Sequence, residues 1–200
     1  MLSETFPARR VARGMAAIVA MAMAAIAVAG AAAGETQPEK PSWMTIDAAN
    51  KKVTLDVMAG WNSNNGVLNF NGYYDGDATV VIPVGWSAEV KFGNNDGYLP
   101  HSLLVTKPFA KADMPETAGS NKVAIPRAYT RSPAAGIAAG ETDGFRFTAG
   151  APGEYYFLCG APGHAQSGMW IHMSVSADAA EPGVIVAPGA TPGRDGASKP

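Results

Sequence analysis

Cysteine and histidine are scarce in this sequence of 200 residues, which holds 1 Cys and 3 His. A single Cys excludes an intramolecular disulfide framework and any four-cysteine zinc or iron–sulfur site. Three His are too few for an enzyme with several metal centres. Charge is also sparse, since Asp, Glu, Lys and Arg make up 16% of the residues and the formal net charge is -2. Because nucleic-acid-binding proteins present a basic face, no nucleic-acid partner is expected.

The central part of the sequence has the periodicity of β-strands rather than of helices. Apolar residues recur with a period of two in short runs separated by turn sequences, at 53–59, 78–84, 87–92, 102–106, 144–148, 153–159 and 169–175. Together with 23 Gly and 15 Pro, this pattern predicts an all-β fold, an antiparallel sandwich or barrel of short strands. The stretch at about 107–140 breaks the pattern with four prolines and is expected to be a long irregular excursion packed on the barrel.

The two ends of the sequence differ from this central part. Three arginines precede an uncharged, Ala-rich run over 15–33 that ends in small residues, so residues 1–33 are predicted to be a signal peptide or an N-terminal membrane anchor. The remainder is then periplasmic or otherwise extracytoplasmic, with possible membrane association through residues 15–33. Residues 34–42 are interpreted as a linker, 43–176 as the folded domain, and the Pro- and Gly-rich residues 177–200 as a flexible tail.

One loop near the end of the predicted domain collects side chains that bind soft metal ions. Cys159, His164 and Met169 follow one another with four residues between each pair, in a Gly- and Pro-rich loop between two apolar runs. His101 stands just ahead of another predicted strand and is the best further imidazole. Two His and one Cys with a weak axial Met are the ligand set of a mononuclear blue-copper electron-transfer site. We therefore expect these four residues to bind one copper ion that alternates between Cu(I) and Cu(II).

Each of these residues also has an interpretation without a metal. Cys159 fits a small buried hydrophobic residue, although an unpaired thiol in an oxidising compartment is a liability that a ligand role explains. Met169 fits an ordinary core position. His172 is the alternative to His101 as the second imidazole ligand, but alternate residues of a strand face opposite sides. If Met169 points toward the metal, His172 therefore points away from it and is expected at the surface, whereas Met173 is expected in the core.

The sequence resembles the cupredoxins, and among them the sulfocyanin family. The resemblance covers roughly residues 43–176 and is carried by FNGYYDGDATVVIPVGW at 70–86, NNDGYLPHSLLV at 94–105 and FLCGAPGHAQSGMW at 157–170. The Cys-x4-His-x4-Met spacing and a Ser after the first ligand His are shared with the rusticyanins. The resemblance implies a Greek-key β-sandwich, type 1 copper and the role of a one-electron carrier. It also implies a cytochrome or a haem–copper terminal oxidase as redox partner.

Further residues are expected to support and expose such a site. Because a ligand His is held through its second nitrogen and a thiolate accepts N–H bonds, Ser102 and either Asn95 or Asn94 are expected to tie the His101 loop to the Cys159 strand. A plain turn at 94–95 is the alternative. The neighbours of His164 carry no charge and predict a flat apolar docking patch, in which a charge at Ala161 or Ala165 is expected to slow electron exchange.

The sequence favours a carrier over two other functions. A multicopper oxidase or nitrite reductase needs more His than the chain has, and a binuclear copper centre needs a second Cys. A Cys–His nucleophile pair lacks an orienting third group, so no enzyme activity is expected. The remaining alternative is a copper-binding module that stores or delivers the metal instead of cycling it.

Overall fold

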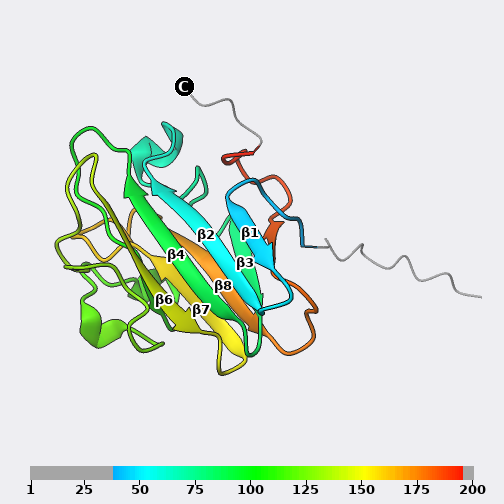
Figure 1. Ribbon diagram of the computed structural model, residues 1–200. Helices are drawn as coiled ribbons and strands as arrows, with labels where there is room; N and C mark the ends of the chain where they lie inside the picture. The colour runs from blue at the N-terminus through cyan, green and yellow to red at the C-terminus, as the bar shows by residue number, and fades with distance from the viewer. Residues whose placement is uncertain (1–37, 196–200) are drawn as a thin grey trace, which may run out of the picture. The chain divides into compact units, whose positions relative to one another are not determined.

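The computed structural model describes residues 38–195, which form two β-sheets packed face to face (Figure 1). One sheet has the strand order β1-β2-β4-β6 and the other β5-β7-β8-β3-β9. The strands are β1 (Met44–Asp47), β2 (Lys52–Ala59), β3 (Ala78–Pro83), β4 (Ser87–Asn94), β5 (Leu104–Thr106), β6 (Thr142–Thr148), β7 (Gly153–Leu158), β8 (Trp170–Ser176) and β9 (Gly183–Val186). The short 3-10 helices are η1 (Asn64–Val67), η2 (Lys111–Asp113) and η3 (Ser120–Lys122). The predicted all-β sandwich is confirmed.

The sheets are mixed, which corrects the expectation of purely antiparallel strands. β2 pairs with β4 in parallel, and β3 pairs with β8 in parallel, whereas the other pairs are antiparallel. Parallel neighbours need a crossover connection, and the segment that links β2 to β3 crosses from one sheet to the other. A period of two reveals which side chains face the core, but it does not reveal which strands are partners.

The core lies between the two sheets because each strand buries alternate side chains. Along β2 the buried and half-buried residues alternate without exception, and Leu55 is fully buried. Phe157 of β7 and Met173 of β8 belong to the same core cluster. Burial of one such side chain contributes about 1.5–3 kcal/mol to stability. The core position predicted for Met173 is confirmed, since it is fully buried.

The C-terminal segment is not wholly a tail, which corrects the boundary at residue 176. β9 pairs with β3, and Val184 of β9 is buried in the main core. Glu39, within the predicted linker, exchanges backbone hydrogen bonds with Val184. Farther on, the Arg194 guanidinium lies 4.8 Å from the centre of the Trp61 ring. The short GVIV run is therefore the edge strand of this sheet, next to β3, despite the turn residues around it.

Residues 1–37 and 196–200 lie outside the described part of the chain, and so does the predicted signal peptide or anchor at 1–33. Within residues 38–195, no helix is long and apolar enough to cross a membrane.

The predicted excursion at 107–140 is irregular apart from η2 and η3, as expected. It covers a second, smaller apolar cluster on the outer face of β7 and β8, which includes Met114, Tyr156 and Trp170. Isolated bridges join it to the sandwich at three places, and one of them pairs Ile137 with His101. The excursion is therefore packed on the sheet next to the end that carries the candidate site.

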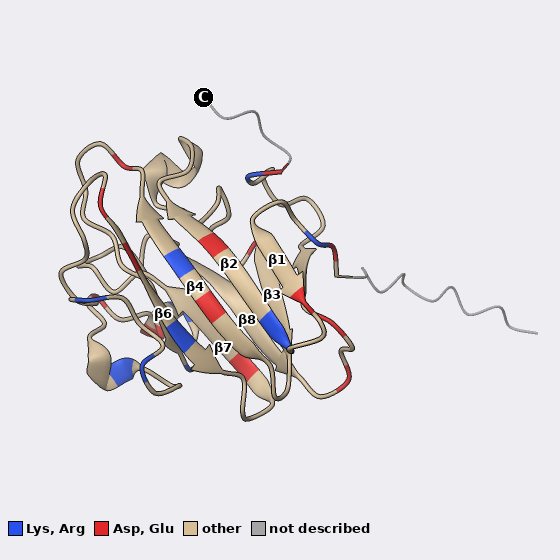
Figure 2. Ribbon diagram, in the orientation of Figure 1, with Lys and Arg blue, Asp and Glu red and all other residues tan. Residues whose placement is uncertain are grey.

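A charged side chain in the middle of the first sheet links three strands. Glu89 of β4 forms ion pairs with Lys52 of β2 at 2.6 Å and with Arg146 of β6 at 2.5 Å. Figure 2 shows acidic and basic residues on the neighbouring strands β2, β4 and β6, and the register places Glu89 opposite Arg146. Hydrogen bonds from Arg146 and Lys52 lower the pKa of Glu89 to about 2.

Replacement of Glu89 by Gln is expected to lower stability at neutral pH and to matter less as the pH falls. The folded-state pKa is below that of the unfolded chain, so the stabilisation is present above the unfolded value and is lost as pH approaches 2. Thermal unfolding of wild type and Glu89→Gln between pH 7 and pH 2 measures this difference, which salt should reduce. An equal difference at both pH values would contradict the assignment.

Candidate metal centre

The loop between β7 and β8 places three of the predicted site residues at one end of the sandwich. The loop is closed by a hydrogen bond of 3.0 Å from the Cys159 amide to the Met169 carbonyl. Inside it, the Met169 amide donates to the His164 carbonyl at 2.9 Å. Gly163 and Gly168 adopt left-handed backbone conformations with φ of 76° and 91°, which only Gly adopts without strain. These turns fold the loop back, so that Cys159, His164 and Met169 stand near one another.

The structure brings His101, Cys159 and His164 together, although His101 comes from a distant part of the sequence. One ligand atom from each of the three lies within 4.8 Å of the other two. The Cys159 Sγ atom is 3.4 Å from Nδ1 of His164, and the two imidazole rings are 5.0 Å apart between centres. This group of one sulfur and two imidazoles is the only such cluster of three or more His, Cys, Asp or Glu within residues 38–195.

One buried atom of this cluster has no hydrogen-bond partner. Nδ1 of His101 is buried within a side chain of 0% exposure and is unpaired. A buried polar atom without a partner destabilises the protein unless something binds it. A metal ion between the three ligand atoms would satisfy this nitrogen, and the soft thiolate with two imidazoles suits copper. The residues present therefore fit a copper ion.

The second nitrogen of His101 is held by a residue that the sequence analysis missed. Nε2 of His101 lies 2.9 Å from Oδ2 of Asp96, and both side chains are buried. Burial lowers the pKa of His101, and Asp96 only partly opposes this effect. Burial alone would raise the pKa of Asp96, but hydrogen bonds from His101, Tyr98 and Leu99 outweigh it and lower that pKa. The pair is thus a neutral imidazole beside a carboxylate. In the sequence, Asp96 stands in an Asn-Asn-Asp-Gly run, whose residue types are typical of turns.

Ser102 stands beside the thiol, where it was expected. Its amide donates to Cys159 Sγ at 3.4 Å. Its hydroxyl accepts from the Gly160 amide at 2.9 Å and donates to the Pro133 carbonyl at 2.6 Å. Burial raises the pKa of the Cys159 thiol, while the amides of Ser102 and Ala161 act in the opposite direction. Ser102 therefore joins the His101 segment, the Cys159 loop and the excursion at one point.

His164 closes the site toward solvent. Its side chain is half-buried, whereas those of His101 and Cys159 are fully buried. Burial, with a smaller contribution from His101, lowers the pKa of His164 to about 4. The ring is thus neutral at neutral pH, which leaves a nitrogen lone pair available to a metal.

Met169 is fully buried in the main core cluster, to which Cys159 also belongs. The buried thioether is therefore compatible with both the ligand and the core interpretation. Its role as an axial ligand stays a prediction.

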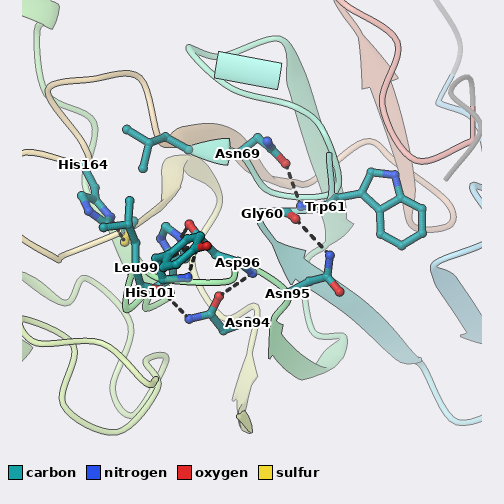
Figure 3. Close-up of polar contacts among 12 residues, drawn as sticks. Gly60, Trp61, Asn69, Asn94, Asn95, Asp96, Leu99, His101 and His164 are labelled. Atoms are coloured by element: carbon teal, nitrogen blue, oxygen red, sulfur yellow. Dashed lines mark hydrogen bonds and ion pairs between the residues drawn. The ribbon is translucent and has the colours of Figure 1, made fainter. Parts of the chain in front are cut away.

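The expectation that Asn95 ties the two ligand loops together is wrong. The side-chain amide of Asn95 donates to the Gly60 carbonyl at 3.2 Å, and Figure 3 shows it directed away from His101. Asn94 instead organises the His101 loop, because its amide donates to the carbonyls of Leu99 and Ile137 at 2.8 and 3.0 Å. Asn94 is buried and Asn95 is exposed, since alternate residues at the end of β4 face opposite sides.

The remaining histidine lies apart from the cluster. His172 of β8 is half-buried on the outer face, where its ring packs edge-on against Tyr156 and Trp170. The alternation along β8 therefore separates His172 from Met169 as predicted, although aromatic rings partly cover the side chain that was expected at the surface. Two positions of the predicted docking patch also need correction, because Ala161 and Ala165 are buried, at 1% and 2% exposure.

The excursion holds the ligand loop through backbone contacts that the sequence did not reveal. The Ala118 amide donates to the Gly160 carbonyl at 3.0 Å, and the Gly163 amide donates to the Glu116 carbonyl at 2.7 Å. His101 and Ile137 exchange two backbone hydrogen bonds, of 3.1 and 2.8 Å. Both ligand-bearing segments are thus fixed to the same irregular segment.

Comparison with known proteins identifies the family of this chain. The family model of the sulfocyanin (SoxE) domain matches residues 40–186. Sulfocyanin from Sulfolobus acidocaldarius is 31% identical over 142 residues, which are 70% of this chain and 71% of that protein. Among solved structures, reduced auracyanin from Roseiflexus castenholzii is 25% identical, over 62% of this chain and 96% of that one, with a TM-score of 0.44. A rusticyanin structure is 23% identical, over 67% and 87% of the two chains, with a TM-score of 0.37. The chain therefore belongs to the sulfocyanin family of cupredoxins, electron-transfer proteins with a single type 1 copper ion.

Proposed function

We propose that Nδ1 of His101, Sγ of Cys159 and Nδ1 of His164 would hold the copper ion, with the thioether of Met169 as a fourth ligand. Two observations carry this proposal: Nδ1 of His101 is buried and unpaired, and one ligand atom each of His101, Cys159 and His164 lies within 4.8 Å of the other two. Bound copper would accept and release one electron at a time by alternating between Cu(II) and Cu(I). The chain is then a carrier of single electrons rather than an enzyme.

The protein's contribution is a site that keeps its shape. The side chains of His101 and Cys159 are completely buried, so water is excluded from that side of the site. The backbone hydrogen bonds from the excursion hold both ligand segments in place. Ligands that move little between the two oxidation states allow fast electron transfer, because the reorganisation energy is then small.

We also propose that the chain works outside the cytoplasmic membrane, between respiratory partners such as a cytochrome and a haem–copper terminal oxidase. The Arg-containing, Ala-rich sequence at 1–33 supports the location. The loop that leads into His101 supports a protein partner, since Gly97 to Pro100 is uncharged and exposed. Tyr98 and Leu99 of this loop are 94% and 39% exposed. With the half-buried His164, this loop offers the small apolar contact typical of transient redox encounters.

The proposed function is tested by whether the visible absorption of the copper-loaded chain disappears on reduction and returns on reoxidation. The full chain is loaded with Cu(II), and its visible spectrum is recorded before and after reduction and again after reoxidation. A carrier gives an intense thiolate-based band that disappears on reduction and returns on reoxidation. Tight Cu(I) binding without such a band would instead identify a protein for copper storage or delivery.

Replacement of Tyr98 by Glu is expected to slow electron exchange between oxidised and reduced copies of the chain by about tenfold, with the visible band unchanged. Two copies that meet at this surface would each present the added charge, and like charges across a contact repel. NMR line broadening in mixtures of the two oxidation states measures the exchange rate.

Val84→Glu is the matched control for this prediction. Val84 is 39% exposed, but it follows β3, which runs parallel to β8 and so ends far from the ligand loop that precedes β8. An equal slowing in Val84→Glu and Tyr98→Glu would show that net charge, and not this surface, sets the rate.

A further inference from the structure

Asp96 is a buried carboxylate whose two oxygens are both occupied. Oδ2 lies 2.9 Å from Nε2 of His101, with side-chain exposures of 3% and 0%. Oδ1 accepts the amides of Tyr98 at 2.9 Å and Leu99 at 3.2 Å. Figure 3 shows Asp96 turned toward the His101 ring. A buried carboxylate is costly unless it is paired, so its place on the far side of a ligand imidazole calls for a functional explanation.

The backbone around Asp96 fixes the direction of its carboxylate. The Asp96 amide donates to Oδ1 of Asn94 at 3.0 Å. Gly60 packs so closely that a Cβ atom there would lie 3.0 Å from the Cβ atom of Asp96. Asn94 in turn holds the Leu99 carbonyl at 2.8 Å. The carboxylate therefore has a single direction, toward the ring of His101.

We propose that Asp96 is a positioning residue of the copper centre, which keeps the ring proton of His101 on Nε2, leaves Nδ1 free for the metal and favours oxidised over reduced copper through its negative charge. The inference rests on the proposed ligand role of His101. A carboxylate that accepts the second N–H of a ligand imidazole fixes the ring and makes the other nitrogen more basic. Since Cu(II) carries one more positive charge than Cu(I), a more basic ligand and a nearby anion both stabilise Cu(II).

The test compares the reduction potential of the copper-loaded full chain with that of Asp96→Asn. The amide oxygen of Asn keeps an acceptor for Nε2 but removes the charge, and charge-assisted hydrogen bonds are about twice as strong as neutral ones. We expect the equilibrium to shift toward Cu(I) by about tenfold, which raises the potential by about 59 mV for one electron. Asp178→Asn removes an exposed acid after β8 and is expected to leave the potential unchanged.

The outcomes separate this inference from the proposed function. A blue Asp96→Asn protein with the wild-type potential would overturn the role of Asp96 and leave the electron carrier intact. A wild-type chain without a blue band would instead overturn the proposed function.

A measurement on the wild-type protein without metal covers the case in which Asp96→Asn does not fold. NMR of the ring nitrogens is expected to show the proton of His101 on Nε2, protected from exchange with water, and no proton on Nδ1. A proton on Nδ1 would refute the positioning role.

Discussion

Replacement of Cys159 by Ser is expected to abolish the intense visible absorption of the copper-loaded protein, with the fold retained. The absorption requires a thiolate bound to Cu(II), and Cys159 is the only cysteine in the sequence. Serine is of similar size, so we expect the β7–β8 loop to keep its conformation. The hydrogen bond that closes the loop, from the residue 159 amide to the Met169 carbonyl, involves only backbone atoms and is retained. The visible spectrum after addition of Cu(II) measures the effect, and thermal unfolding of the metal-free protein checks the fold.

His172→Gln is the matched control for this experiment. It removes an imidazole, a side chain of a type that can bind copper, from a position on β8 that packs on Tyr156 and Trp170, outside the cluster. The variant is expected to keep the full colour of the wild type. Colour that survives in Cys159→Ser, or disappears in His172→Gln, would mean that the copper is bound elsewhere.

Replacement of Gly160 by Ala is expected to destabilise the protein by about 3 kcal/mol, in the upper part of the range for overpacking. A Cβ atom at Gly160 would lie 2.1 Å from the Ala118 carbonyl oxygen and 2.5 Å from the Pro133 carbonyl oxygen. Because both neighbours are backbone atoms, relief requires the excursion to move away from the ligand loop. Denaturant unfolding of the metal-free full chain measures the loss, and a weaker blue band after copper loading should accompany it.

The control for Gly160 is a glycine on the other ligand-bearing segment. A Cβ atom at Gly97 would meet nothing within 4 Å, so Gly97→Ala is expected to change stability by less than about 0.5 kcal/mol. If Gly160→Ala were as stable as Gly97→Ala, the close contact between the excursion and the ligand loop would be wrong.

The strands were largely readable from the sequence because the core of a sandwich enforces alternation. The runs at 53–59 and 87–92 correspond to β2 and β4. β9 was missed because Gly183 and the nearby prolines indicate a loop, whereas the burial of Val184 against β3 comes from tertiary contacts. The parallel pairs were not predictable, since alternation identifies a buried face and not a neighbour.

The candidate site was predictable to the extent that its ligands share one loop. Cys159, His164 and Met169 have a recognisable spacing, and only His101 had to be chosen from elsewhere in the sequence. Asp96 was not predictable, because an Asp in a turn usually binds the backbone after it, as Asp96 does at Tyr98. Its second contact, with the ring of His101, depends on how the loop turns back in three dimensions.

X-ray absorption at the copper edge of the oxidised, copper-loaded chain tests the central claim most directly. If Cys159, His101 and His164 bind the same ion, the nearest neighbours of copper are one sulfur and two imidazole nitrogens, and the sulfur is lost in Cys159→Ser. A copper ion surrounded only by nitrogen and oxygen in the wild-type protein would contradict the account.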